Sequence, residues 1–147
     1  MKYLLIIVAA VSMIVSCQSA DKKAEPALTQ EEKEKALSDS ANFTKIQWLD
    51  STVQDLGKIK EGQVVEVTYH FKNIGEKPLI ISDVSASCGC TVPEKPEKAF
   101  APGEEGVIKA KFDSGGQHHG EARKTVYVNA NTNPQMTYLS FNLEVTD

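Results

Sequence analysis

The most constraining feature of the sequence is a regular alternation of apolar and polar residues in short runs. In VVEVTYHFKN, residues 64–73, apolar residues fill the odd positions from Val65 to Phe71 and polar residues fill the even ones. Side chains alternate between the two faces of an extended strand, so this period of two predicts a strand with one buried face. The same period recurs in three further runs: VIKAKF (107–112), KTVYVNA (124–130) and MTYLSFNLEV (136–145).

About seven short strands are expected between Thr44 and the C-terminus, joined by turns rich in Gly, Pro and Asn. No run in this region of the chain has the period of a helix. The pattern therefore predicts an all-β domain over residues 44–147, an immunoglobulin-like antiparallel β-sandwich of about seven strands. A small closed barrel is the competing architecture. Trp48, the single tryptophan, is expected in the core between the sheets.

The first residues predict an export signal that is not part of the fold. Lys2 precedes an apolar run from Leu4 to Val15, which is short for a membrane-spanning helix, and IVSC (14–17) ends it. This pattern resembles the bacterial lipobox, in which a peptidase cleaves before a cysteine that carries a diacylglyceryl group. We therefore expect a lipoprotein signal peptide over residues 1–16 and lipidation at Cys17. A plain secretory signal with a chance cysteine is the alternative.

Residues 17–43 are expected to be the lipidated cysteine followed by a polar spacer. Thr29 and Glu32 have the spacing of a capping box, so a short helix can form here. Its apolar residues make no continuous stripe, however, so it is expected to have little to pack against. The segment is therefore predicted to be a solvated, flexible tether between the lipid and the domain.

Two tripeptides, DSA (39–41) and DST (50–52), resemble an O-glycosylation signal used by some Gram-negative envelopes. Ser40 and Ser51 are therefore candidate glycosylation sites, although such tripeptides also arise by chance.

Two reactive side chains, Cys88 and Cys90, lie two positions apart in SASCGCT (85–91). On an extended strand their Cα atoms would lie about 6.5–7 Å apart, at the upper edge of disulfide reach. Gly89 can adopt a positive φ and kink the backbone, and the resulting small loop would be easily reduced, which is a route to a redox role. The structural alternative is a pair of small residues at a corner where a strand leaves one sheet for the other. Spacing alone leaves a bonded pair, free thiols and a metal site open.

A metal site is a further interpretation of the same pair. Two thiolates on one side suit Cu(I), or half of a zinc site. The additional ligands would be His118 and His119 in the Gly-rich turn GGQHHGE, which would have to bend for both to bind one ion. Apart from this candidate, no cofactor is expected.

Charge and motifs exclude several function classes. The formal net charge is −4, so nothing draws the chain to nucleic acid. No Ser/His/Asp set has a supporting motif, and no glycine-rich phosphate loop opens a helix. The chain is therefore expected not to be an enzyme.

Four segments together resemble the domain of unknown function family 1573. They are DLGKIKEG (55–62), FKNIGEKPLII (71–81), SCGCTVP (87–93) and APGEEGVIKAKFD (101–113). The resemblance runs from about Ile46 to Val145. It implies an immunoglobulin-like module of the kind found mainly in envelope lipoproteins of Gram-negative bacteria, related to binding and assembly modules of cilia and sperm proteins. It implies no enzyme activity and no known ligand.

The expected function is therefore that of a lipid-anchored envelope protein whose domain binds or organises another envelope component, a protein or a glycan, without catalysis. Ser19 stands at the second position after Cys17, where Asp would favour retention in the inner membrane, so the outer membrane is favoured. Whether the domain faces the periplasm or the exterior is left open. Thiol-redox chemistry or Cu(I) handling at Cys88 and Cys90 is the alternative function.

Overall fold

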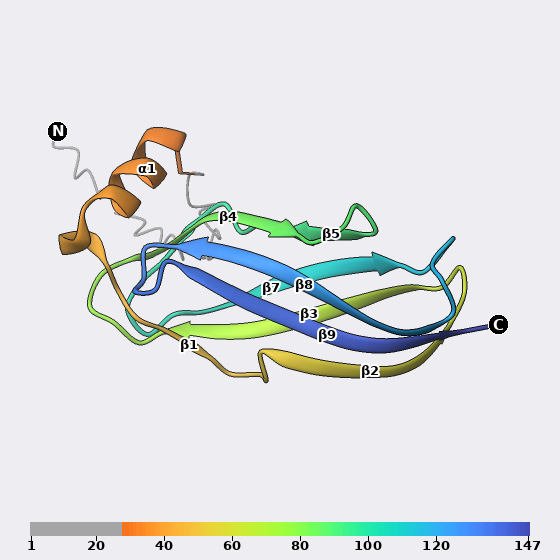
Figure 1. Ribbon diagram of the computed structural model, residues 1–147. Helices are drawn as coiled ribbons and strands as arrows, with labels where there is room; N and C mark the ends of the chain where they lie inside the picture. Colours follow the sequence, from red (N-terminus) through yellow and green to blue (C-terminus); the bar gives the residue numbers. More distant parts are fainter. Residues whose placement is uncertain (1–27) are drawn as a thin grey trace, which may run out of the picture.

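The computed structural model describes residues 28–147. Over these residues a pair of β-sheets packs face to face, with a short helix at one end (Figure 1). The elements follow in this order: α1 (Gln30–Ser38), the 3-10 turn η1 (Ser40–Asn42), β1 (Ile46–Trp48), β2 (Val53–Lys60), β3 (Val64–Asn73), β4 (Leu79–Ala86), β5 (Thr91–Glu94), β6 (Ala99–Phe100), β7 (Glu105–Asp113), β8 (Gly120–Ala130) and β9 (Met136–Thr146).

The predicted immunoglobulin-like sandwich is confirmed, with nine strands in place of about seven. One sheet has the order β1-β3-β7-β5 and the other β2-β9-β8-β4-β6. The short strands β5 and β6 are four and two residues long, and β2 is a full strand of eight residues. All pairings are antiparallel except β2 with β9, which is parallel and carries an irregularity between Asp55 and Lys58. Gly57 provides the positive φ of 67° at this irregularity.

The core lies between the sheets, where the predicted inward residues of β3, β7, β8 and β9 meet. The rings of Phe112 and Phe141 contact edge to face across the two sheets, with 5.8 Å between centroids. Trp48 is only partly buried, and its ring packs edge to face against the ring of Phe71, with 5.7 Å between the centroids. It therefore lies at the rim of the core rather than at its centre.

Side-chain hydrogen bonds to backbone also tie the sheets together. The hydroxyl of Tyr69 on β3, fully buried, donates to the carbonyl oxygen of Ser140 on β9 at 2.8 Å. The amide nitrogen of Gln54 on β2 donates to the carbonyl oxygen of Thr68 at 2.8 Å. Burial raises the pKa of Tyr69 to about 12, so it stays a neutral donor at ordinary pH.

Helix α1 packs against the domain, so the expectation that it would have little to pack against is wrong. The capping box of Thr29 and Glu32 forms as predicted. The side chain of Lys33 is only 4% exposed, and its Nζ lies 2.8 Å from the Glu97 carboxylate in the segment between β5 and β6. Ala36 is buried, and Gln135 donates to the carbonyl oxygen of Leu37 at 2.7 Å. Contacts with residues distant in the sequence dock the helix, which its own apolar pattern did not reveal.

The expected signal peptide, Cys17 and the beginning of the spacer lie outside the described residues. Among residues 28–147, no helix is long and apolar enough to cross a membrane.

Candidate functional site

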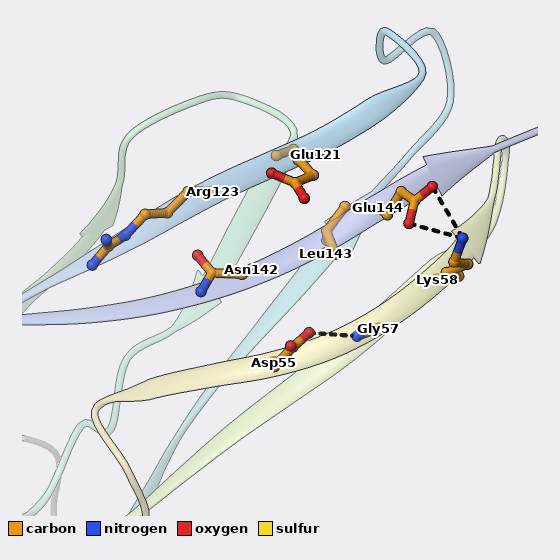
Figure 2. A pocket seen from close by; sticks show the side chains of 9 residues that line it. Asp55, Gly57, Lys58, Glu121, Arg123, Asn142, Leu143 and Glu144 are labelled. Atoms are coloured by element: carbon orange, nitrogen blue, oxygen red, sulfur yellow. Dashed lines mark hydrogen bonds and ion pairs between the residues drawn. The ribbon is translucent and has the colours of Figure 1, made fainter.

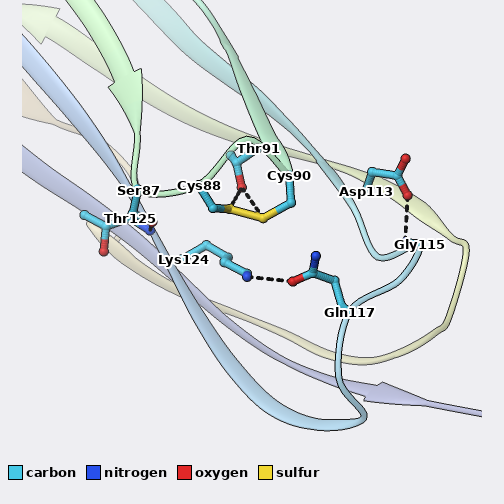
Figure 3. The surroundings of a disulfide bond; sticks show 9 residues. All are labelled: Ser87, Cys88, Cys90, Thr91, Asp113, Gly115, Gln117, Lys124 and Thr125. Atoms are coloured by element: carbon cyan, nitrogen blue, oxygen red, sulfur yellow. Dashed lines mark hydrogen bonds between the residues drawn. A yellow bond between two sulfur atoms is a disulfide. The ribbon is translucent and has the colours of Figure 1, made fainter.

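The Cys88–Cys90 corner is one of the turns that connect the two sheets. The strand β4 of the five-stranded sheet ends at Ala86, and β5 of the four-stranded sheet begins at Thr91. The cysteines between them form a disulfide, and their Cα atoms are 5.3 Å apart (Figure 3). The backbone N–H of Thr91 donates to the carbonyl oxygen of Cys88 at 3.2 Å, so a tight turn brings the two residues within disulfide reach. The corner and the disulfide, considered above as alternatives, therefore occur together.

Gly89 does not act as expected. Positive φ values among the described glycines occur at Gly57, Gly62, Gly103, Gly116 and Gly120, but not at Gly89. A Cβ atom at Gly89 would have nothing within 4 Å. The turn from Cys88 to Thr91 shortens the Cα separation without the left-handed backbone that the sequence suggested.

The two sulfurs have different surroundings. Both cysteines are half-buried, but Cys90 packs against the hydrophobic core and Cys88 does not. The Thr91 hydroxyl lies 3.5 Å from the Cys88 sulfur and 4.0 Å from the Cys90 sulfur. Thr91 itself is 3% exposed, so this hydroxyl is fixed in a largely buried position between the sulfurs and the core.

The rim beside the disulfide also holds a cation. Figure 3 shows Lys124 of β8 among the surroundings of the disulfide, with its amine directed to Gln117. The Nζ of Lys124 donates to Oε1 of Gln117 at 2.9 Å and lies 5.2 Å from the centroid of the Phe112 ring. A positive charge near a cysteine favours its thiolate form.

The disulfide contributes little as a structural staple. Linking residues two positions apart removes on the order of 1.5 kcal/mol of chain entropy from the unfolded state, less than the 2–4 kcal/mol typical of disulfides that close longer loops. The sandwich already has a continuous core that spans both sheets. The pair is therefore not explained by a need to hold the fold together.

The structure does not gather the four candidate metal ligands. The Cys88 and Cys90 sulfurs are bonded to each other. His119 instead places Nε2 3.0 Å from Glu61 and Nδ1 3.0 Å from the Asp147 side chain, and His118 is exposed. Within residues 28–147, no group of three or more His, Cys, Asp or Glu side chains is arranged to hold a metal ion.

The His119 cluster has electrostatic consequences. The hydrogen bond with Glu61, followed by the charge of Asp147, raises the pKa of His119 above its usual value. The same hydrogen bond holds the pKa of the Glu61 carboxyl below its usual value. The pair therefore favours its ionised form.

The candidate glycosylation sites Ser40 and Ser51 are both exposed. The Ser51 hydroxyl donates to the carbonyl oxygen of Val53 at 2.6 Å. Modification at either serine stays a prediction.

The outer face of the four-stranded sheet carries three ion pairs between neighbouring strands, together with the exposed Val64 and Val92. Such pairs keep a solvent-facing surface polar and locally neutral. They are Glu66–Lys109 (3.6 Å), Lys72–Glu105 (3.1 Å) and Glu94–Lys111 (3.1 Å).

The outer face of the five-stranded sheet is different, and we call its central region the tyrosine face: Tyr127, Tyr138, Met136, Val53 and Arg123. Tyr127 and Tyr138 are cross-strand partners on β8 and β9, with ring centroids 5.7 Å apart. Tyr138 is 61% exposed, and Met136 and Val53 are exposed apolar residues of the same sheet. The strand alternation placed both tyrosines outward, but their pairing depends on the β8–β9 register, which the sequence does not show.

A groove of about 670 Å³ continues this face toward the end of the sheet that carries Lys58. Figure 2 shows Arg123 and Asn142 lining it beside Asp55, with the Lys58–Glu144 ion pair (3.1 Å) further along. The guanidinium of Arg123 donates to the Ser140 hydroxyl at 3.4 Å. Arg123 forms no ion pair with the residues described, so its charge is available to a ligand.

Comparison with known protein families gives one match. The model of a family described as "Protein of unknown function (DUF1573)" matches residues 46–145. No curated protein matches the chain.

Solved structures similar to this chain share its fold at low sequence identity. A protein of unknown function from Porphyromonas gingivalis W83 is 15% identical with a TM-score of 0.59, over 72% of this chain and 49% of that one. The ASH/PapD-like domain 7 of human CEP192 is 10% identical with a TM-score of 0.56, over 93% and 99%. The chaperone YadV is 15% identical with a TM-score of 0.51, over 69% and 52%. The match spans about half the length of the Porphyromonas protein, and at these identities the likeness concerns the fold alone.

Proposed function

The chain belongs to the DUF1573 family, whose function is unknown, and we propose that it is a lipid-anchored envelope protein whose sandwich domain binds another envelope protein without catalysing a reaction. The location rests on the lipobox that ends at Cys17, and Ser19 favours the outer membrane of a Gram-negative bacterium. The fold is compatible with this role, and on such a fold the surface residues, not the fold itself, decide what is bound.

The tyrosine face is the observation that carries the binding proposal. Tyrosine and arginine are enriched in the centres of protein interfaces, where charged pairs are depleted. Tyr127 and Tyr138 offer two rings with their hydroxyls, and Arg123, four residues along β8 on the same face, offers a charge that forms no ion pair with the described residues. The opposite sheet face is neutralised by its own ion pairs, so it is the less suitable surface.

Site-specific photocrosslinking in the native host tests the binding face. A photoreactive amino acid at position 138 is expected to link the chain to one defined envelope protein, and a pull-down then identifies it. The control is position 92, where Val92 is 62% exposed on the other sheet. Absence of a specific product at position 138, or the same products at both positions, would contradict the proposal. A glycan adduct in place of a protein would reassign the partner class.

Membrane anchoring is tested separately at Cys17. The variant Cys17→Ser is expected to lose lipid labelling and to leave the membrane fraction, because the attached acyl chains supply about 0.8 kcal/mol per buried methylene. Ser16→Ala is the control, since a small residue still precedes the cysteine, and it should stay membrane-bound. Retention of Cys17→Ser in washed membranes would refute the anchor.

A further inference from the structure

We propose that the Cys88–Cys90 disulfide is a thiol-exchange site that accepts two electrons from a protein dithiol, and that Cys88 is the sulfur the dithiol attacks. This role goes beyond the proposed binding function and does not depend on it. The disulfide closes a very small loop in the turn between β4 and β5, and both of its cysteines are only half-buried, so the bond is not shut away in the core and can exchange.

The environments of the two sulfurs assign their roles. Cys90 packs against the hydrophobic core, and its carbonyl oxygen accepts the backbone N–H of Asp113 at 2.9 Å, so it is held against the sandwich. Cys88 has no such core contact. An incoming thiolate must approach one sulfur along the line of the disulfide bond, and we assign that sulfur to Cys88 because Cys90 is the one packed against the core.

The Thr91 hydroxyl provides what the leaving sulfur needs. Its oxygen lies within 4.0 Å of both sulfurs, so one rotation of the O–H directs its proton to either. A hydrogen bond to a thiolate stabilises that charged form and makes the sulfur a better leaving group. Lys124, held at the rim by Gln117, adds a positive charge to the same surroundings.

The exchange proceeds in two balanced steps. A thiolate of the partner attacks the Cys88 sulfur, a mixed disulfide forms, the Cys88–Cys90 bond breaks, and its electron pair goes to Cys90, which takes the hydrogen bond from Thr91. The partner's second thiolate then attacks the partner sulfur of the mixed disulfide and releases the Cys88 thiolate. The partner ends as a disulfide, and Cys88 and Cys90 end as thiols after taking up two protons.

Reduction kinetics of the full-length chain test the site. Reduced thioredoxin serves as the protein-dithiol probe and dithiothreitol as the small one, and alkylation followed by peptide mapping separates Cys88 and Cys90 from Cys17. We expect both probes to reduce the disulfide in the folded protein. Thr91→Val should slow reduction about tenfold, because a hydrogen bond to a charged group is lost. Thr68→Val, the same substitution on the outer side of β3, should leave the rate unchanged.

Single-cysteine variants test the assignment of Cys88. With glutathione disulfide as the probe, Cys90→Ser, which keeps Cys88, should form its mixed disulfide about tenfold faster than Cys88→Ser, which keeps Cys90. Unfolding midpoints of all variants establish that they are folded. Equal rates in the two variants would overturn the assignment. Reduction only under unfolding conditions would overturn the exchange site, and reduction by dithiothreitol without reduction by thioredoxin would overturn the protein partner.

Discussion

At the scale of single residues, three tyrosines on different strands have different roles. Tyr69 is fully buried and donates across the sandwich, whereas Tyr127 and Tyr138 form a ring pair on the outer face. The positions are separated by strand parity, since an inward residue on β3 meets the other sheet and an outward residue on β8 or β9 meets solvent. The same side chain therefore stabilises the fold in one place and is available for binding in the other.

The hydrogen bond of Tyr69 gives a quantitative prediction. Tyr69→Phe should lower the free energy of unfolding by about 1–2 kcal/mol, because the Ser140 carbonyl loses its buried partner. Urea unfolding followed by circular dichroism measures the change. Tyr138→Phe, which removes an exposed hydroxyl, is the matched control and should change stability by less than about 0.5 kcal/mol. Equal effects of the two variants would show that the cross-sheet bond contributes nothing.

At the scale of secondary-structure elements, local patterns predicted the long strands and missed what depends on distant partners. The alternation of apolar and polar residues in β3, β8 and β9 is a local property of each run, so their buried and exposed faces were predicted correctly. The parallel pairing of β2 with β9 and the two-residue β6 exist only through their neighbours. The capping box of α1 was likewise local and visible, but its docking depends on Glu97, which lies 64 residues from Lys33.

The same distinction applies to the candidate sites. The spacing of Cys88 and Cys90 identified them as a candidate pair. Only the turn geometry shows that they are bonded and that the Thr91 hydroxyl lies within 4.0 Å of both sulfurs. The tyrosine face was missed because a pair on two strands has no signal in either strand alone. The sequence makes His119 a candidate metal ligand, whereas its neighbours in space are carboxylates from the β2–β3 turn and the C-terminus.

The docking of α1 is testable with one substitution. Lys33→Ala removes the contact with Glu97 and should weaken docking by about 1 kcal/mol, a modest value because the Glu97 carboxylate is half-exposed. Hydrogen exchange of the amides in residues 33–38 should then accelerate about fivefold, with the sandwich amides unchanged. Lys35→Ala, an exposed lysine of the same helix, should leave the exchange as in the wild type. Equal exchange rates in both variants would mean that the Lys33–Glu97 contact contributes nothing to docking, since Lys→Ala alone raises helix propensity.

At the scale of the whole molecule, the two ends of the sandwich differ. Helix α1 lies at one end, and the C-terminus lies at the other together with the β2–β3 turn and the β7–β8 loop (Figure 1). His119 lies in the β7–β8 loop and contacts Glu61 of the β2–β3 turn and Asp147 at the C-terminus. One titrating side chain therefore connects all three segments at the end opposite the helix. The stability of this end should therefore depend on pH.

The sign of that dependence follows from the two shifts. The pKa of His119 is raised in the folded state, so its contribution is complete below the unfolded value of about 6.5 and is lost as the pH rises through the folded pKa. The pKa of Glu61 is lowered, so its contribution is complete above about 4.3 and is lost as the pH falls through the folded pKa. The stabilisation is therefore fully present between about pH 4.3 and 6.5.

Urea unfolding at pH 5.5 and pH 8.5 measures how much the His119–Glu61 pair contributes to the free energy of unfolding at each pH. His119→Gln should reduce the stability difference between the two pH values, and the reduction should be smaller at high salt because both side chains are exposed to screening. His118→Gln is the control, since His118 forms no hydrogen bond or ion pair with the described residues, and it should keep the wild-type difference. NMR titration of Glu61→Gln should show the pKa of His119 moving down toward 6.5, because the largest cause of its shift is the Glu61 hydrogen bond. An unchanged His119 pKa in that variant would show that the carboxylate of Asp147 alone controls the histidine.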